Sequence, residues 1–282
     1  MHRRILDLHR TAFVTGAASG LGRAFAEMLL DEGVRVWGTS RDVARLADLV
    51  VRHPSLFTPV VLDLADGAAA EAVFLQAAAG AGGAFDLVIN NAGYGLFGDF
   101  ALTDATVWLA QIDVLLTATL RLTHAAFRAM RARDRGCLVN ISSLAAEFPL
   151  PFMTGYNVSK AGLSALSESL IFESRGTAVR VIDFRPGDYR TAFNDAMKSL
   201  SPPTDSPVSA AQASAWRVLE ANLRAGPPAS RAAADLRRAL LRNRSAVVRS
   251  GSLFQARAAP LLARLSPAAL VRAAQARYFG CR

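Results

Sequence analysis

The sequence predicts an α/β fold with one doubly wound parallel sheet, helices on both of its faces, and a helical C-terminal lid and tail. Short apolar strands alternate with helical patterns from residue 11 to residue 249, which is the order of a parallel sheet. A glycine-rich turn at 15–22 joins the first strand directly to the first helix. With 282 residues, we expect one domain over 1–282, a substrate lid at about 188–230 and a tail at about 253–279.

The elements follow one another in a regular alternation. The first unit is a strand at 11–15, a helix from Leu21 that Gly33 ends, and a second strand at 34–39. Further strands are predicted at 58–62, 85–89, 137–141, 178–184 and 245–249, and helices at 103–133, after residue 153, at 210–223 and at 229–242. The tail is expected to form two short helices broken by Pro260 and Pro267.

The composition excludes several classes of protein. The net charge is +9 and the pI is about 10.6, but the arginines are scattered and no aromatic residues lie among them, so we expect no nucleic-acid partner. Cys137 lies in an apolar strand and Cys281 near the end of the chain, so we predict no disulfide framework and no metal site. We find no signal peptide and no stretch that could span a bilayer, and we expect a cytoplasmic protein.

The turn TGAASGLG at 15–22 has the features of a dinucleotide-binding loop. Glycines allow the backbone to approach a pyrophosphate closely, and the amino end of the following helix favours negative charge. A plain tight turn would have a similar sequence, but the strand at 34–39 completes a βαβ unit and favours the dinucleotide.

Ser40 and Arg41 lie at the end of the second strand, where enzymes that use NAD carry an acidic residue for the ribose hydroxyls. Arg41 could instead pair with a 2′-phosphate, so NADP(H) is favoured over NAD(H). The alternative is a solvated surface arginine.

Two further strand ends border the same predicted crevice. Asp63 and Leu64 follow the third strand and are expected at the adenine edge. The segment NNAGYG at 90–95 follows the fourth strand, and its asparagines could brace the crevice floor while Gly93 permits close approach. The alternative there is a simple asparagine-rich turn.

The stretch at 136–160 carries the predicted chemistry. An apolar strand delivers Ser142 and Ser143 to its carboxyl end, and Tyr156 and Lys160 follow four residues apart on one helix face. A tyrosine has a pKa near 10, and an ammonium about 4 Å away would lower it by roughly three units before desolvation of the phenolate opposes this shift. Ser143, Tyr156 and Lys160 thus suit proton transfer at an oxygen, with Ser142 as the rival of Ser143.

Together, TGAASGLG, NNAG, Ser143, YNVSK and the PG at 186–187 resemble the classical short-chain dehydrogenase/reductase family over about 11–191. The resemblance implies a Rossmann-type sheet, a Ser-Tyr-Lys catalytic set, hydride transfer with a nicotinamide cofactor, and a homodimer or homotetramer. The family's serine-to-tyrosine spacing favours Ser143 over Ser142. It also implies these cofactor contacts: Gly16, Ser19, Gly20, Leu21 and Gly22 at the pyrophosphate; Asp63 and Leu64 at the adenine; Asn90, Ala92 and Gly93 at the adenosine side; Tyr156 and Lys160 at the ribose; and Pro186, Gly187, Tyr189 and Thr191 at the nicotinamide.

One position departs from the family pattern. The family often has an asparagine on the helix before the serine strand, where it supports a proton-relay water, and the matching position in QIDVLL is taken to be Asp113. The family relay runs largely through a water at the backbone carbonyl, so Asp113 is a candidate catalytic participant. Its ionisable side chain would then change the pH profile.

In the last third of the chain, the lid, the GPP at 226–228, the strand VVRSGS at 247–252 and the closing LSPAALVRAAQARYFG at 265–280 resemble the branch with retinol dehydrogenases and 17β-hydroxysteroid dehydrogenases. This resemblance implies a lipophilic ketone or secondary alcohol as substrate. The alternative is a 3-keto lipid or a carrier-bound 3-oxoacyl substrate, and a further alternative is a non-catalytic nucleotide-binding regulatory protein. The tail has leucines and alanines facing one way and arginines the other. It could pack on the domain or make a peripheral membrane contact.

Overall fold

A computed structural model describes residues 3–191, 193, 197–200 and 209–281, with backbone only for 198–199. Its centre is a parallel seven-stranded sheet in the order β3-β2-β1-β4-β6-β7-β9. The strands are β1 (Thr11–Val14), β2 (Arg35–Ser40), β3 (Phe57–Val61), β4 (Leu87–Asn90), β6 (Gly136–Ile141), β7 (Val179–Pro186) and β9 (Ala246–Ser250). This arrangement confirms the predicted fold class, and each predicted strand is present within about two residues.

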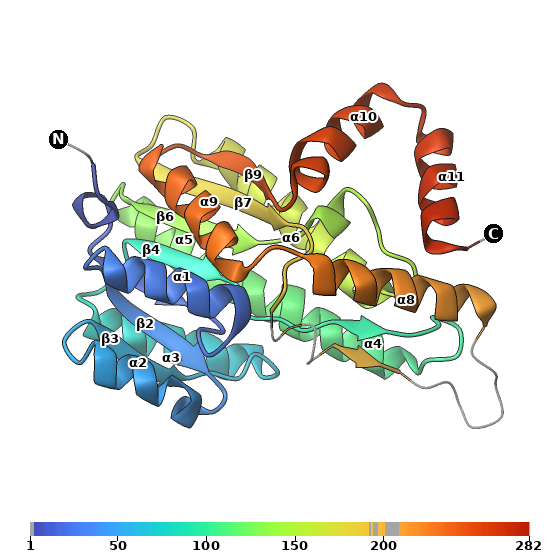
Figure 1. Cartoon of the computed structure of the whole chain (residues 1–282). Coiled ribbons are helices and arrows are strands. Elements are labelled where there is room, and N and C mark those ends of the chain that lie inside the picture. The colour runs from blue at the N-terminus through green and yellow to red at the C-terminus, as the bar shows by residue number, and fades with distance from the viewer. Residues whose placement is uncertain (1–2, 192, 194–196, 201–208, 282) are drawn as a thin grey trace.

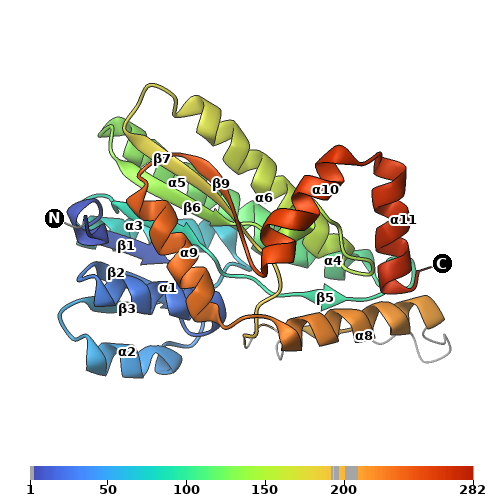
Figure 2. The same ribbon diagram turned by 45° about the horizontal axis from the view of Figure 1, so that its top comes forward.

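Helices cover both faces of the sheet, as Figures 1 and 2 show. One apolar core lies between the sheet and α1 (Gly20–Asp31), α2 (Ala47–Arg52) and α9 (Ala229–Leu241). The other lies under α3 (Gly67–Gly80), α5 (Ala118–Ala132) and α6 (Thr154–Glu173). The strands are accordingly apolar on both sides, which is typical of a fully covered parallel sheet. Short 3-10 turns are η1 (Ile5–Asp7), η2 (Val43–Leu46) and η4 (Leu144–Ala146).

The strand order defines where a ligand can bind. β1 lies between β2 and β4, so the chain leaves β1 toward one edge of the sheet and later returns to build the other half. At such a reversal the loops after the two central strands separate and leave a crevice at their carboxyl ends. The glycine loop after β1 and the Asn91–Gly93 segment after β4 border this crevice.

A second group of elements lies beyond the carboxyl ends of the strands. It contains α4 (Ala105–Ile112), the two-stranded ladder of β5 (Leu96–Phe97) and β8 (Lys198–Ser199), α8 (Ala210–Ala225), α10 (Ala259–Leu265) and α11 (Ala268–Phe279). In Figure 1 the red tail helices α10 and α11 stand over this end of the molecule, and α11 packs on α8. A small apolar cluster that includes Phe97, Leu219 and Phe279 joins them.

Proline explains one tail break and not the other. Pro267 separates α10 from α11, as the sequence predicts. Pro260 does not break the chain: it lies in the first turn of α10, and the helical backbone continues through it. The π-helical turn η5 (Phe254–Ala258) leads directly into that turn.

One long helical stretch also requires a correction to the sequence analysis. α4, the π-helical turn η3 (Asp113–Thr117) and α5 form a continuous 28-residue span, Ala105–Ala132, which contains an 18-residue window with mean hydropathy 1.3. Its length and composition would allow it to cross a membrane, although no such stretch was expected. Its residues Ala118 and Leu122 pack in the core under the sheet, as in the core helix of a globular fold.

Candidate active site

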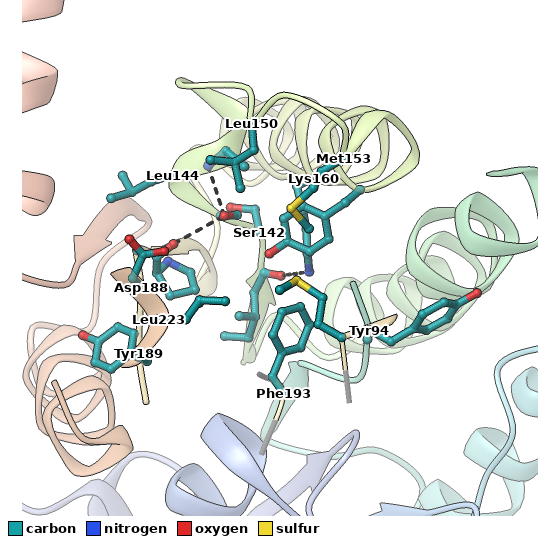
Figure 3. A pocket seen from close by; sticks show the side chains of 18 of the residues that line it. Tyr94, Ser142, Leu144, Leu150, Met153, Lys160, Asp188, Tyr189, Phe193 and Leu223 are labelled. Carbon is teal, nitrogen blue, oxygen red and sulfur yellow. Dashed lines mark hydrogen bonds between the residues drawn. The ribbon is translucent and has the colours of Figure 1, made fainter. Parts of the chain in front are cut away.

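A cavity of about 1630 Å³ opens at the strand reversal. It extends from the ends of β2 and β3, past the glycine loop, to Ser143, Tyr156 and Lys160, and on to the tail helices. Figure 3 shows the part around Lys160. Polar groups lie mainly along the sheet, and side chains from the lid and tail make the far wall apolar.

The structure brings the predicted catalytic side chains together. Ser143 follows β6, and its Oγ accepts a hydrogen bond from the Ala145 backbone N–H at 3.0 Å and donates to the Pro186 carbonyl at 3.4 Å. Tyr156 lies in the first turn of α6, and its phenol is near enough to Ser143 for the serine hydroxyl to lower the pKa of the phenol. Both groups line the cavity, so an oxygen bound there could contact both of them.

Lys160 lies one turn further along α6 and is 6% exposed. Its Nζ donates a hydrogen bond to the Ile141 carbonyl at 2.7 Å and lies 5.7 Å from the centre of the Tyr156 ring. Burial lowers the pKa of Lys160 to about 8, and the nearby Asp183 carboxylate opposes this shift. The ammonium can therefore release or take up a proton near neutral pH.

The expected effect of Lys160 on Tyr156 needs correction. The sequence argument assumed an ammonium about 4 Å from the phenol and a lowered pKa for the tyrosine. In the structure, burial raises the pKa of Tyr156, the nearby Ser143 hydroxyl lowers it, and the negative charge of Asp188 raises it. Desolvation of the phenolate dominates because the Lys160 ammonium is held at the Ile141 carbonyl.

A buried polar network supports the set from behind. Asp183 is fully buried, and its carboxylate accepts hydrogen bonds from Ser142, from Ser164 at 2.7 Å and from the Arg185 guanidinium at 2.7 Å. Ser142 adjoins Ser143, and Ser164 lies one helical turn beyond Lys160, so Asp183 fixes β6 relative to α6. This engagement leaves Ser143 as the serine that contacts Tyr156.

The glycine loop is shaped to hold a phosphate. Gly16 and Gly20 have positive φ angles, of 70° and 58°, which glycine adopts without strain. Ser19 precedes α1 but makes no side-chain cap, and no acidic residue occupies the first turn of α1. The first backbone N–H groups of α1 are thus open to a negatively charged ligand, and these residues fit the pyrophosphate of a dinucleotide.

Most of the predicted cofactor residues line this cavity, and two do not. Those on the wall are Gly16, Ser19, Gly20, Leu21, Arg41, Asp63, Leu64, Ala92, Gly93, Tyr156, Lys160, Pro186, Gly187, Tyr189 and Thr191. Gly22 lies behind the loop, where a Cβ atom would come within 2.3 Å of the Gly16 carbonyl oxygen. Its lack of a side chain lets α1 pack against the loop.

Asn90 is the second exception, because it does not line the cavity. Its side chain is buried and donates to Asn140 Oδ1 at 2.9 Å and to Thr123 Oγ1 at 3.0 Å. Asn90 is still part of β4 and points toward α5, whereas Asn91 reaches the cavity. Asn90 therefore braces the crevice floor, which was the other possibility for these asparagines.

The end of β2 presents two cations to the cavity. Arg41 and Arg45 both line it, and neither makes an ion pair within the described part of the chain. The nearby Asp42 carboxylate accepts a hydrogen bond from the Ala44 backbone N–H and caps η2. Asp63 is exposed and caps its own turn through the Ala65 N–H.

Asp113 lines the cavity as the first residue of the π-helical turn η3, directly after α4. Its carboxylate is exposed and accepts a hydrogen bond from Thr117 at 3.3 Å. No hydrogen bond joins it to Ser143, Tyr156 or Lys160 within the described residues. Its role in a proton relay stays a prediction.

Sequence reasoning missed three residues of the site, Arg45, Asp188 and Gln255, whereas Asn91 has the bracing role expected of the asparagines at 90–95. Asn91 fixes the loops, because its backbone N–H and that of Ala92 donate to the Thr15 hydroxyl at 2.8 and 2.9 Å. Asp188 directly follows the PG motif, and its position alone could have suggested a place beside the catalytic residues. Gln255 comes from the tail, and no local pattern pointed to it.

Comparison with known proteins identifies the family. The family model for short chain dehydrogenases matches residues 10–200. A 3-ketodihydrosphingosine reductase from Bacteroides thetaiotaomicron is 30% identical over 182 residues, which cover 64% of this chain and 65% of that protein. A probable NADP-dependent dehydrogenase from Haemophilus influenzae is 33% identical over 178 residues, covering 63% of this chain and 70% of that one. The chain thus matches slightly less than two thirds of the length of the first relative.

Solved structures agree over nearly the whole chain. A short-chain dehydrogenase from Streptomyces avermitilis superposes with a TM-score of 0.80 at 28% identity, covering 91% of this chain and 93% of that one. A short chain dehydrogenase/reductase from Burkholderia phymatum in complex with NAD gives 0.78 at 26% identity, covering 92% of each chain.

These matches extend over the glycine loop, the asparagine segment and the Ser-Tyr-Lys set that the fold brings to one cavity. The relatives that share these elements are named as dehydrogenases and reductases, and one of the solved structures holds NAD. The chain belongs to the short-chain dehydrogenase family.

Proposed function

We propose that the protein is an NADP(H)-dependent oxidoreductase that interconverts a lipophilic ketone and the corresponding secondary alcohol. The observation that carries this proposal is the meeting of Ser143, Tyr156 and Lys160 on one cavity whose remaining wall is largely apolar. The cavity is large enough for a dinucleotide and a substrate side by side.

In the reductive direction, Tyr156 donates its proton to the carbonyl oxygen of the substrate. Its raised pKa suits an acid that must stay protonated at neutral pH. Ser143 donates a second hydrogen bond to the same oxygen and stabilises the negative charge that develops on it. Lys160, with a pKa of about 8, restores the proton to Tyr156. The bound nicotinamide supplies or accepts the hydride.

The preference for NADP(H) is supported by the end of β2. A 2′-phosphate there would meet Arg41 and Arg45, two guanidinium groups without a carboxylate partner among the described residues. Asp42, which could otherwise accept ribose hydroxyls, is engaged as the cap of η2. The name of the Haemophilus influenzae relative also points to NADP.

A lipophilic substrate is supported by the lid and tail. Residues from 188–230 and 253–279 supply apolar cavity-lining side chains, including Phe193, Leu219, Leu223, Val271 and Phe279. This wall is compatible with the retinol and 17β-hydroxysteroid dehydrogenase branch. The second candidate is a 3-keto lipid reductase, which the name of the Bacteroides thetaiotaomicron relative favours. A carrier-bound 3-oxoacyl substrate belongs to the same alternative.

The surface supports association with a second copy of the chain. Exposed apolar side chains lie on the packed helices α4, α5 and α6, namely Leu109, Leu120, Val158 and Phe172. Exposed aliphatic and aromatic groups of this kind are commonly covered by a partner. We infer a homodimer or homotetramer, which light scattering of the purified protein would test.

We also infer a cytoplasmic protein that touches a membrane through its tail. Between 253 and 281 there is no acidic residue, while Arg257, Arg264, Arg272 and Arg277 carry positive charge. Leu261 and Leu265 are 60% and 75% exposed on α10. Such helices suit an anionic bilayer surface. Co-sedimentation with anionic vesicles should fall sharply when both leucines become serine, and unchanged binding would reject the contact.

The experiment that tests the proposed reaction is direct. Purified protein is mixed with NADPH or NADH and with panels of steroid, retinoid and 3-keto lipid carbonyls, and the loss of nicotinamide fluorescence is followed. We expect turnover with lipophilic ketones and a clear preference for NADPH. Turnover with small polar ketones alone, or a preference for NADH, would contradict the proposal.

A further inference from the structure

We propose that Asp188 makes this site selective for substrates that carry a cationic amine on the carbon next to the reacting carbinol or carbonyl carbon. The inference rests on the proposed function and narrows its substrate class. It begins from a carboxylate that the reaction itself does not require and that lies beside the reacting groups.

The backbone fixes where Asp188 lies. It comes two residues after Pro186, whose carbonyl accepts the hydrogen bond of the Ser143 hydroxyl. Asp188 lines the same cavity as Ser143 and Tyr156, and its negative charge raises the pKa of the Tyr156 phenol. A substrate oxygen held by Ser143 and Tyr156 would therefore place its neighbouring carbon atoms close to the Asp188 carboxylate.

The carboxylate has one neutral partner and no cation. Asp188 Oδ2 accepts a hydrogen bond from the Gln255 side chain at 2.5 Å. Within the described residues no arginine or lysine makes an ion pair with Asp188. Gln255 is in η5, so this bond also ties the start of the tail to the wall of the cavity.

The surroundings make a lone carboxylate unfavourable. Figure 3 shows Asp188 among the apolar side chains of Leu144 and Leu223. Burial raises the pKa of Asp188, which means that the ionised form lacks solvation or a counter-charge. A substrate ammonium would supply that charge and form a charge-assisted hydrogen bond with the carboxylate.

The other charged groups on the cavity wall do not duplicate this role. Arg41, Arg45 and Asp63 lie at the ends of β2 and β3, and Asp113 comes from η3. The Nζ of Lys160 donates a hydrogen bond to the Ile141 carbonyl. Among the described residues, Asp188 is thus the carboxylate that borders Ser143 and Tyr156.

The same charge changes the chemistry in a way that depends on the substrate. Without an amine, Asp188 opposes formation of the phenolate at Tyr156, which is the base for alcohol oxidation. An ammonium bound to Asp188 cancels this effect and favours the phenolate. The carboxylate therefore disfavours plain alcohols and favours amino alcohols at the same step.

The test uses three matched long-chain secondary alcohols, one plain, one with a hydroxyl and one with an amine on the neighbouring carbon. Oxidation by NADP⁺ is followed for the wild type and for Asp188→Asn. We expect the wild type to favour the amino alcohol in kcat/KM by roughly 10- to 100-fold. In Asp188→Asn the preference should vanish, because the amino alcohol becomes slower while the plain alcohol is unchanged or faster.

The pH dependence gives a second readout. The preference needs ionised Asp188, so it should be present at neutral pH and fall as the pH drops through the raised pKa of that carboxyl. With the plain alcohol, the rate of oxidation rises with pH as Tyr156 loses its proton. In Asp188→Asn this rise should occur at lower pH, because the charge that raises the pKa of Tyr156 is gone. A variant that merely misfolds would not change the pH at which the rate rises.

Asp113→Asn is the matched control, because it removes another carboxylate of the same cavity and should leave the ratio between the substrates unchanged. Three results would each overturn the inference. The first is an equal loss of activity on the plain and the amino alcohol in Asp188→Asn, and the second is a wild-type preference for the hydroxy compound. The third is a larger effect of Asp188→Asn on NADP⁺ affinity than on the substrate ratio. If none of the alcohols is oxidised and NADP⁺ does not bind, the proposed function itself fails.

Discussion

Replacing Lys160 by methionine should separate stability from activity. The Lys160 side chain is 6% exposed, and burial lowers its pKa from 10.5 to about 8. The folded pKa lies below the unfolded one, so between these pH values the unfolded chain binds more protons. The free-energy cost of burying the charged Lys160 is therefore at its full value below pH 8 and disappears as the pH rises to 10.5.

The size of the effect follows from that shift. A difference of 10.5 − 8 pKa units corresponds to about 3 kcal/mol that the buried ammonium costs the folded state at neutral pH. Lys160→Met removes this cost but leaves the Ile141 carbonyl without its hydrogen-bond donor, which costs about 1–3 kcal/mol. We expect the variant at pH 7 to be as stable as the wild type or more stable by up to about 2 kcal/mol, and to be inactive.

The assay is urea unfolding of both proteins without cofactor at several pH values between 7 and 10.5. The lost hydrogen bond contributes equally at each pH, so the difference in unfolding free energy isolates the proton equilibrium. As the pH rises over this range, the unfolding free energy of the wild type should increase by about 3 kcal/mol relative to that of the variant. A difference that stays flat with pH would refute the claim that Lys160 is held in a desolvating site.

Three further predictions test other parts of the molecule. The double variant Arg41→Ala and Arg45→Ala should raise the Michaelis constant for NADPH by roughly 10-fold or more and leave that for NADH nearly unchanged, which initial-rate kinetics would check; equal effects would count against a phosphate contact. Gly22→Ala should cost roughly 2 kcal/mol or more in thermal or urea unfolding and weaken cofactor binding, since its Cβ would meet the Gly16 carbonyl; a fully stable variant would disprove the close packing. His9 is buried with its Nδ1 unpartnered, and burial lowers its pKa to about 4. As the pH falls from 6.5 to 4, the unfolding free energy of the wild type should therefore fall by roughly 3 kcal/mol relative to that of His9→Leu. Unfolding free energies that change in parallel with pH in the two proteins would contradict this.

Much of the fold was readable from local patterns. Strands such as β1 and β6 are short apolar runs followed by glycine or serine, and they occur within a residue or two of their predicted bounds. By contrast, α2 and α3 were not assigned. α3 is rich in alanine, so apolar residues occur on all its sides and no clear helical stripe marks its buried face.

The site was predictable where sequence spacing decides geometry. Tyr156 and Lys160 are four residues apart on one helix, and their closeness follows from the helix itself. The state of Tyr156 was not predictable, because its pKa depends on burial by the lid and on Asp188. Likewise, whether Asn90 or Asn91 faces the cavity depends on where β4 ends, and a shift of one residue reverses the face.

The most direct test of the whole account is a pair of measurements on Tyr156→Phe, namely the affinity for NADPH and the rate of NADPH oxidation with an active ketone. The account predicts that the affinity stays within a few-fold of the wild type while the rate falls by several orders of magnitude, since only the proton donor is removed. A variant that retains substantial activity would contradict the assignment of Tyr156 as the acid that protonates the substrate oxygen.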